Sequence, residues 1–243
     1  MGEQFDLFGN PENETAPEPV PKAPEPHRVL YFDLETQKSA EDVGGWANSH
    51  LMRLAVGVVW DSREQDFRVY LENEEDRRKL EKQSPGARVD GLAEDLVRKL
   101  TEADLVVGFN VKGFDYAVLQ PYANPLGIDL QELPTLDMLA EVHKKLNHRL
   151  PLDNLARCTL GAAKSADGLQ SLKWYKEGKL DPIIEYCKQD VRVTRDLFLF
   201  GEKEGHVLYD SRSRGPQRLE VDWDSEALIR RLKPGDPVRR PPF

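Results

Sequence analysis

Proline is distributed so unevenly along this 243-residue chain that it restricts where a packed domain can form. Six of the 17 prolines fall within residues 11–26, five fall within residues 216–242, and only six occur in the long stretch between them. Proline fixes φ and lacks a backbone N–H, so it is excluded from helix interiors and central strands. Residues 1–27 also mix proline with glutamate and have few large apolar side chains, which predicts a disordered acidic tail.

The rest of the chain is expected to form a single domain over residues 28–210, followed by a basic extension rich in arginine and proline over residues 211–243. Hydrophobic residues make up 39% of the sequence, which is enough for one sizeable core. The 43 Asp and Glu residues outnumber the 34 Lys and Arg residues, and the formal net charge is -9. This balance excludes a simple basic nucleic-acid-binding protein.

The sequence shows no sign of a membrane segment or a metal–thiolate site. It has no apolar run long enough to span a bilayer, and the segment after Met1 lacks the basic flank and apolar stretch of a signal peptide. We therefore expect a soluble, cytoplasmic protein with no membrane partner. Cys158 and Cys187 are too isolated for a zinc site or a disulfide framework, so both are expected to be buried thiols.

Apolar runs predict a sheet in the first half of the domain. Residues 29–34, 54–60 and 67–71 are expected to form three antiparallel strands. An amphipathic helix over residues 91–102 and a buried strand over residues 105–109 should follow. Three antiparallel strands followed by alternating helices and strands indicate an α/β fold with a mixed sheet flanked by helices.

The chain from Phe114 onward is predicted to be mainly helical, with one strongly signalled helix. Asp181 suits the N-cap of this helix and Pro182 suits its first helical position. Apolar side chains then recur at a spacing of three to four residues, at Ile183, Cys187, Val191, Thr194 and Phe198.

Two carboxylates share one face of the first predicted strand. Asp33 and Glu35 are two residues apart, so their side chains point to one side of the sheet while Phe32 and Leu34 point into the core on the other. Side-by-side carboxylates repel one another, and a divalent cation relieves this repulsion because Mg²⁺ and Mn²⁺ prefer carboxylate oxygens. The alternative is a strand end that has simply reached solvent.

Two later segments carry further acidic residues. Asp115 lies near the start of a predicted helix, five residues after Asn110. The alternative is that Asp115 only interacts favourably with the dipole of that helix. Tyr186 and Asp190 are four residues apart on the strongly signalled helix, so they project from the same face. Taken alone, neither pattern identifies a site.

In the order D-x-E, N-x-x-x-F-D and Y-x-x-x-D, these residues resemble the three sequence blocks of the DEDDy-type 3'-5' exonucleases, which belong to the DnaQ-like, ribonuclease H-like superfamily. The resemblance covers about residues 28–210 and implies a ribonuclease H-like fold. The chain is most similar to the bacterial YprB-like branch over four short stretches, residues 32–40, 44–46, 152–156 and 186–191.

The resemblance also implies a phosphodiesterase site with two divalent cations, Mg²⁺ or Mn²⁺. Asp33 would bridge both ions, Glu35 and Asp190 would complete one ion site, and Asp115 would hold the other ion largely through waters. Tyr186 would orient the attacking water, because a phenol with a reference pKa of about 10 is better suited to positioning than to general-base catalysis at neutral pH.

Three further residues are candidates for substrate binding. Asn110 could hydrogen-bond the sugar or phosphate near the scissile bond, and Thr36 could bind the terminal nucleotide, although either would equally serve to brace local structure. Trp46 follows Gly44 and Gly45 in the loop after the first strand and suits stacking on a base. Its alternative role is to cover the core.

A short motif precedes the proline-rich segment. Gln4, Leu7 and Phe8 lie in a stretch, residues 4–8, that resembles the pentapeptide by which bacterial replication proteins dock into the sliding clamp. Apolar anchors without a core to join suggest a partner protein. The alternative is a segment that packs back onto its own domain.

The leading hypothesis is a metal-dependent 3'-5' exonuclease that acts on single-stranded or frayed DNA and is recruited to the sliding clamp at the bacterial nucleoid for replication or repair. A 3'-5' exoribonuclease in RNA processing is the nearest alternative, because the carboxylates do not distinguish the two sugars. A non-catalytic nucleic-acid-binding adaptor is a third, disfavoured by the complete ligand set. The acidic net charge predicts weak intrinsic affinity for the substrate.

Overall fold

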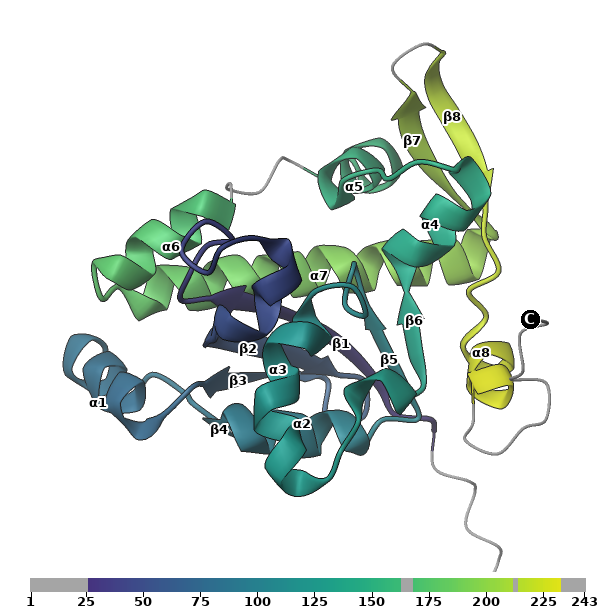
Figure 1. Cartoon of the computed structure of the whole chain (residues 1–243). Coiled ribbons are helices and arrows are strands. Elements are labelled where there is room, and N and C mark those ends of the chain that lie inside the picture. The colour runs from purple at the N-terminus through teal and green to yellow at the C-terminus, as the bar shows by residue number, and fades with distance from the viewer. Residues whose placement is uncertain (1–25, 163–167, 212–213, 233–243) are drawn as a thin grey trace, which may run out of the picture.

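The computed structural model describes residues 26–162, 168–211 and 214–232 (Figure 1). Its centre is a six-stranded sheet with the order β4-β3-β2-β1-β5-β6. The strands are β1 (Val29–Thr36), β2 (Leu54–Asp61), β3 (Asp66–Leu71), β4 (Gly91–Leu92), β5 (Leu105–Gly108) and β6 (Thr135–Asp137). Strand β2 is antiparallel to both β1 and β3, whereas β5 runs parallel to β1 and β6 runs parallel to β5. The predicted α/β fold with a mixed sheet is confirmed.

Helices cover both faces of this sheet (Figure 1). On one face, Leu96 of α2 and Leu119 of α3 join a core with Phe32 and Leu34. On the other face, a second core is built around α7, the longest helix. The helices are α1 (Glu74–Gln83), α2 (Ala93–Thr101), α3 (Asp115–Ala123), α4 (Met138–Leu146), α5 (Leu152–Leu160), α6 (Gly168–Lys176), α7 (Leu180–Glu204) and α8 (Ser225–Leu232), with short 3₁₀ helices at Trp46–Leu51, Asn124–Leu126 and Leu130–Glu132. None of the helices in these described ranges is long and apolar enough to cross a membrane.

A separate two-stranded hairpin follows α7. It consists of β7 (His206–Ser211) and β8 (Gly215–Glu220) and stands on α5, where the Asn154 side chain forms hydrogen bonds with the backbone of Asp210 in both directions. The domain boundary expected after residue 210 therefore falls inside this hairpin.

The predicted start of α7 was wrong by two residues. Asp181 was expected to be the N-cap, but the helix begins at Leu180 with Lys179 as the N-cap. Leu180 is buried and so joins the first turn, while the Asp181 carboxylate accepts a hydrogen bond from the Ser84 hydroxyl at the end of α1. A tertiary hydrogen bond of Asp181 has replaced the local cap that the sequence suggested.

Candidate metal centre

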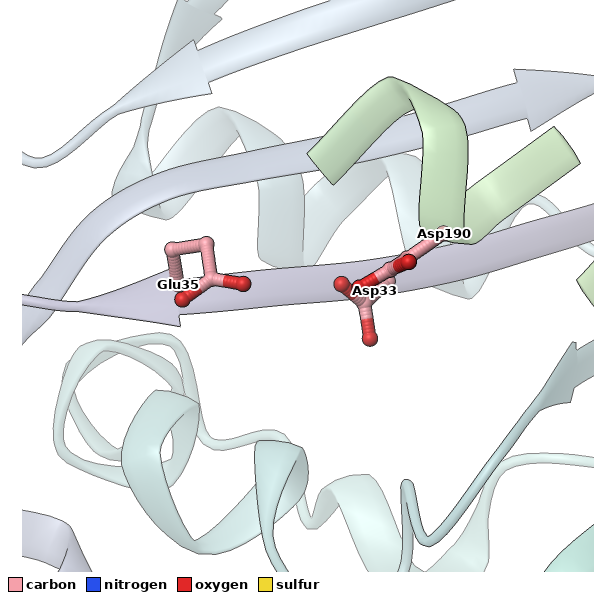
Figure 2. A group of neighbouring side chains, drawn as sticks. All are labelled: Asp33, Glu35 and Asp190. Carbon is pink, nitrogen blue, oxygen red and sulfur yellow. The ribbon is translucent and has the colours of Figure 1, made fainter. Parts of the chain in front are cut away.

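Three carboxylates from β1 and α7 converge beside the sheet (Figure 2). Asp33 and Glu35 point from alternate positions of β1 to the same face, and Asp190 reaches them from α7. One oxygen from each of the three lies within 4.8 Å of the others. The hydrophobic side chains of Phe32 and Leu34 fill the opposite face, as the alternation of a strand requires.

Asp115 lies next to this group at the first residue of α3. Its side chain is buried, and its charge is one of those that raise the pKa of Asp33. Burial raises the pKa of Asp115 itself well above its usual range, and backbone hydrogen bonds, one from Leu34, act in the opposite direction. The structure thus brings all four predicted carboxylates together. Asp115 is not among the three whose oxygens lie within 4.8 Å of one another.

The environment disfavours ionisation of Asp33, Glu35 and Asp115 in the absence of a cation. Burial raises the pKa of Asp33 far above normal, and the charges of Asp115, Asp190 and Glu35 raise it further. Burial raises the pKa of Glu35 to about 8, against the opposing effect of a hydrogen bond from Ser171. A divalent cation would reverse both effects, because it supplies positive charge to oxygens that are its preferred ligands. The donor set therefore fits Mg²⁺ or Mn²⁺.

Two neighbours of the carboxylates have no counterpart among the predicted site residues. The Ser171 hydroxyl on α6 donates to Glu35 Oε2. The buried Cys187 thiol lies 3.6 Å from Asp33 Oδ2 and 3.4 Å from the Asp33 carbonyl oxygen. Burial and the nearby acids raise the pKa of this thiol well above its usual value, so Cys187 is neutral and inert at physiological pH.

Tyr186 lies one helical turn before Asp190, as its spacing predicted. Its ring contacts Trp174 of α6 edge to face, with centroids 6.5 Å apart. Burial raises the pKa of Tyr186, the acidic neighbours raise it further, and a hydrogen bond with Asp190 contributes. The phenol therefore keeps its proton at neutral pH and can act as a hydrogen-bond donor.

The loop between β5 and α3 carries Asn110 to the edge of the site. Asn110 has a φ of 67°, a left-handed conformation that asparagine tolerates better than most residues. Its backbone N–H donates to Asp137 Oδ1 over 2.9 Å, and its side-chain Oδ1 accepts a 2.7 Å hydrogen bond from Arg149. Lys112 N–H donates to the other oxygen of Asp137. Asp137 thus fixes the loop that leads into Asp115.

The two candidate residues after β1 lie in different surroundings. The Thr36 side chain is buried, and its hydroxyl donates to the carbonyl oxygen of Lys38, so it braces its own loop. Trp46 is 72% exposed, the highest value for a large hydrophobic side chain in the described part of the chain. Its ring contacts Phe114 edge to face at 5.8 Å. Most of the Trp46 ring is therefore accessible to a ligand.

Sequence reasoning missed four residues of this region, namely Asp137, Arg149, Ser171 and Cys187. Asp137 had a signal, because an aspartate directly before an apolar run is a typical N-cap, and it does cap α4. The other three had none, since their roles depend on how α6, α7 and the loop after α4 pack. The predicted partner residues Gln4, Leu7 and Phe8 lie outside the described residues.

Comparison with known proteins identifies a family and shows a likeness to solved structures. A family model described as the RNase_H superfamily matches residues 30–199. None of the curated proteins matches the chain. Among solved structures, the family B DNA polymerase from the hyperthermophilic archaeon Pyrobaculum calidifontis aligns with a TM-score of 0.49 and 19% identity, over 76% of this chain and 26% of that chain. This protein thus spans about a quarter of that polymerase.

Proposed function

This chain belongs to the RNase_H superfamily, and from that premise we propose that it is a metal-dependent 3'-5' exonuclease of the DEDDy type that acts on single-stranded or frayed DNA ends. The observation that carries the proposal is the convergence of Asp33, Glu35 and Asp190 within ligand distance of one another. The adjoining Asp115 and Tyr186 complete the five residues that the three sequence blocks singled out.

The carboxylates would hold two divalent cations, with Asp33, Glu35 and Asp190 around one ion and Asp115 together with Asp33 around the other. Bound there, the cations would lower the pKa of a water and neutralise charge that develops on the phosphate. The chain's own contribution is to hold the ligands in place. Ser171 fixes one oxygen of Glu35, and β1 and α7 fix the other two carboxylates.

Tyr186 is assigned the positioning of the attacking water. Its raised pKa keeps the phenol protonated, so it does not accept the proton of the water. Because its O–H bonds Asp190, the phenol oxygen is held next to a metal ligand, where it can accept a hydrogen bond from the water. Substitution by Phe should therefore lower kcat much more than it raises KM.

Trp46 is assigned a stacking contact with a base at the 3' end, and Asn110 and Thr36 are retained as weaker candidates for contacts to the terminal nucleotide. Trp46 supports this role best because its ring is exposed and stands on Phe114, directly before Asp115. Base stacking on an aromatic ring is worth about 1 to 3 kcal/mol. A flat, sequence-independent contact of this kind suits an enzyme that removes any nucleotide in turn.

The decisive experiment follows the degradation of DNA and RNA oligonucleotides labelled at either end, with Mg²⁺ or Mn²⁺. We expect stepwise loss of 3' nucleotides from DNA, and loss of activity by orders of magnitude in Asp33→Ala and Asp190→Ala. Asp196→Ala is the control, because it removes an exposed carboxylate elsewhere on α7. Hydrolysis that persists in both site variants would refute the site, and cleavage of RNA alone would identify an exoribonuclease.

We also propose that residues 4–8 recruit the enzyme to the bacterial sliding clamp, as the motif around Gln4, Leu7 and Phe8 suggests. A short flexible tether would raise the effective concentration at the substrate to about the mM range, which would offset weak intrinsic affinity. Leu7→Ala plus Phe8→Ala should abolish clamp binding while hydrolysis of free oligonucleotides stays unchanged. Clamp binding that survives both substitutions would refute the tether.

A further inference from the structure

The end of α4 and the loop after it form the most basic exposed stretch near the candidate metal centre. Residues 143–149 read His-Lys-Lys-Leu-Asn-His-Arg, in a chain whose net charge is -9. We call the four exposed side chains Lys144, Lys145, His148 and Arg149 the basic rim. Basic residues in the last turn of a helix favour its dipole, but Arg149 lies beyond the end of α4 and gains nothing from it.

Within the described residues, the cations of the basic rim form no close ion pair with a carboxylate. In the described ranges, several arginines and lysines at comparable exposure form ion pairs, such as Arg88 with Asp66 and Arg157 with Asp210. Lys144, Lys145 and Arg149 form none there, although the charge of Lys145 acts on the nearby Glu220 carboxylate of β8. The charges of Lys144 and Arg149 are therefore the most available to a ligand.

Arg149 links the basic rim to the loop before the candidate metal centre by a hydrogen bond. Its Nη2 donates to Asn110 Oδ1 over 2.7 Å, so the guanidinium is held by a neutral amide and keeps its full charge. Asn110 is tied through its backbone to Asp137, and the same loop leads five residues later to Asp115. The guanidinium is thus linked through Asn110 to the loop that leads to Asp115, and within the described residues most of its five donors are uncommitted.

We propose that the basic rim binds the phosphates of the substrate strand beside the metal centre, with Arg149 on the phosphate nearest the site; this inference rests on the proposed nuclease function. The net charge of the chain is -9, which disfavours binding of a polyanion, so binding needs positive charge placed just outside the cluster. A guanidinium fork matches a phosphate in a bidentate way, and the two lysines extend the interaction along the strand.

The test measures binding of a fluorescein-labelled single-stranded oligonucleotide at several salt concentrations in EDTA, together with kcat and KM in Mg²⁺. We expect about tenfold weaker binding for Arg149→Ala and for Lys144→Ala plus Lys145→Ala. The slope of log affinity against log salt should fall by about 0.7 for each phosphate that the variant no longer binds. KM should rise while kcat and the melting temperature change little.

Matched controls remove equal charge elsewhere. Arg98→Ala on α2 and Arg78→Ala plus Lys82→Ala on α1 replace exposed cations, and α1 lies on the opposite side of the molecule from α4 in Figure 1. These controls should leave the salt slope at its wild-type value. Arg149→Lys should restore the slope but only part of the affinity, because lysine binds phosphate as a point charge.

The outcomes separate the basic rim from the nuclease proposal. Suppose that the wild-type protein degrades DNA, but the rim variants keep the wild-type salt slope or the control variants lose as much affinity as they do. The proposal for the basic rim is then wrong, and the nuclease assignment stands. A role of Arg149 only as a brace for Asn110 would lower kcat with an unchanged slope, and it would overturn the rim equally. If the wild-type protein binds through the rim but hydrolyses nothing, the nuclease assignment fails alone.

Discussion

At the scale of single residues, the candidate site shows how far a sequence pattern can predict geometry. The two-residue period of a strand was enough to place Asp33 and Glu35 on one face, and the four-residue spacing placed Tyr186 beside Asp190. The β1 carboxylates and the α7 residues come together only because α7 crosses β1, which no local pattern specifies. For the same reason, Ser171 could not be predicted as a partner of Glu35.

The raised pKa of Glu35 predicts how the stability of the metal-free protein depends on pH. Its pKa rises from about 4.5 in the unfolded chain to about 8 in the folded protein, so the protonated form favours folding. Its contribution is complete below pH 4.5 and is lost as the pH rises through about 8. In EDTA, the melting temperature of Glu35→Gln should therefore exceed that of the wild type by a margin that grows from pH 5 to pH 8.5.

Added Mg²⁺ at pH 8.5 supplies the internal check on this prediction. The cation should raise the melting temperature of the wild type, because it binds the ionised carboxylates of the folded state only. It should raise that of Glu35→Gln much less. A margin between the two proteins that does not change with pH would contradict the prediction, since a packing effect of the substitution is independent of pH.

Ser171→Ala should weaken binding of Mg²⁺ or Mn²⁺ in a way that depends on pH. The Ser171 hydroxyl bonds Glu35 and lowers its pKa, so its removal leaves more Glu35 protonated at pH 7. Loss of such a supporting hydrogen bond costs about tenfold or more in metal affinity. Calorimetric titration should show a large loss at pH 7 that narrows as the pH rises to 9, because a higher pH favours ionisation of Glu35 without the help of Ser171. An equal loss at both pH values would contradict it.

At the scale of elements, the strands with apolar runs and the amphipathic helix α2 were predictable, whereas elements that depend on tertiary packing were not. The three-residue strand β6 is too short to show a period. Helix α1 has Leu80 as its only buried apolar side chain, so its sequence carries no hydrophobic stripe. Polar contacts hold α1 in place. Asn73 is its N-cap, and Tyr175 of α6 donates a hydrogen bond to Asp76 in its first turn.

Asp137 links helix α4 to the loop before α3, and its replacement should affect both stability and catalysis. Its carboxylate caps α4 through Leu139 N–H and Ala140 N–H, and it also accepts from the backbone of the Asn110 loop. Asp137→Ala leaves these buried or partly buried donors unpaired and should lower the free energy of unfolding by about 2 to 4 kcal/mol. Urea unfolding measures this loss.

The loop that Asp137 holds leads into Asp115, so kcat of Asp137→Ala should fall at temperatures where the variant is still folded. Asp129→Ala is the control, since Asp129 caps only the 3₁₀ helix at Leu130–Glu132. It should lose about 1 kcal/mol of stability and keep its activity. If Asp137→Ala lost stability but kept full kcat when folded, Asp137 would serve α4 alone.

At the scale of the whole molecule, the segment beyond the family match is part of the same core. The match ends at residue 199, yet Trp223 is buried and stacks on Phe198 of α7 with ring centroids 6.3 Å apart. Leu228 and Ile229 of α8 join the same cluster. The high content of proline and arginine after residue 211 concealed this, because composition alone does not reveal a few apolar anchors placed between polar residues.

Gly201 on α7 tests whether this segment belongs to the folded unit. A Cβ added at Gly201 would overlap the ring of Trp223, so Gly201→Ala should displace residues 221–223 from α7. Overpacking of this kind costs about 1 to 3 kcal/mol, whereas Gly→Ala at an exposed helical position stabilises by up to about 1 kcal/mol. The sign of the change in stability is therefore diagnostic.

Thermal unfolding should show a lower melting temperature for Gly201→Ala, partly restored by adding Trp223→Leu, which makes room for the new methyl group. A rise in melting temperature would mean that α7 is free of the C-terminal segment in solution, and that the domain ends near the limit of its family match.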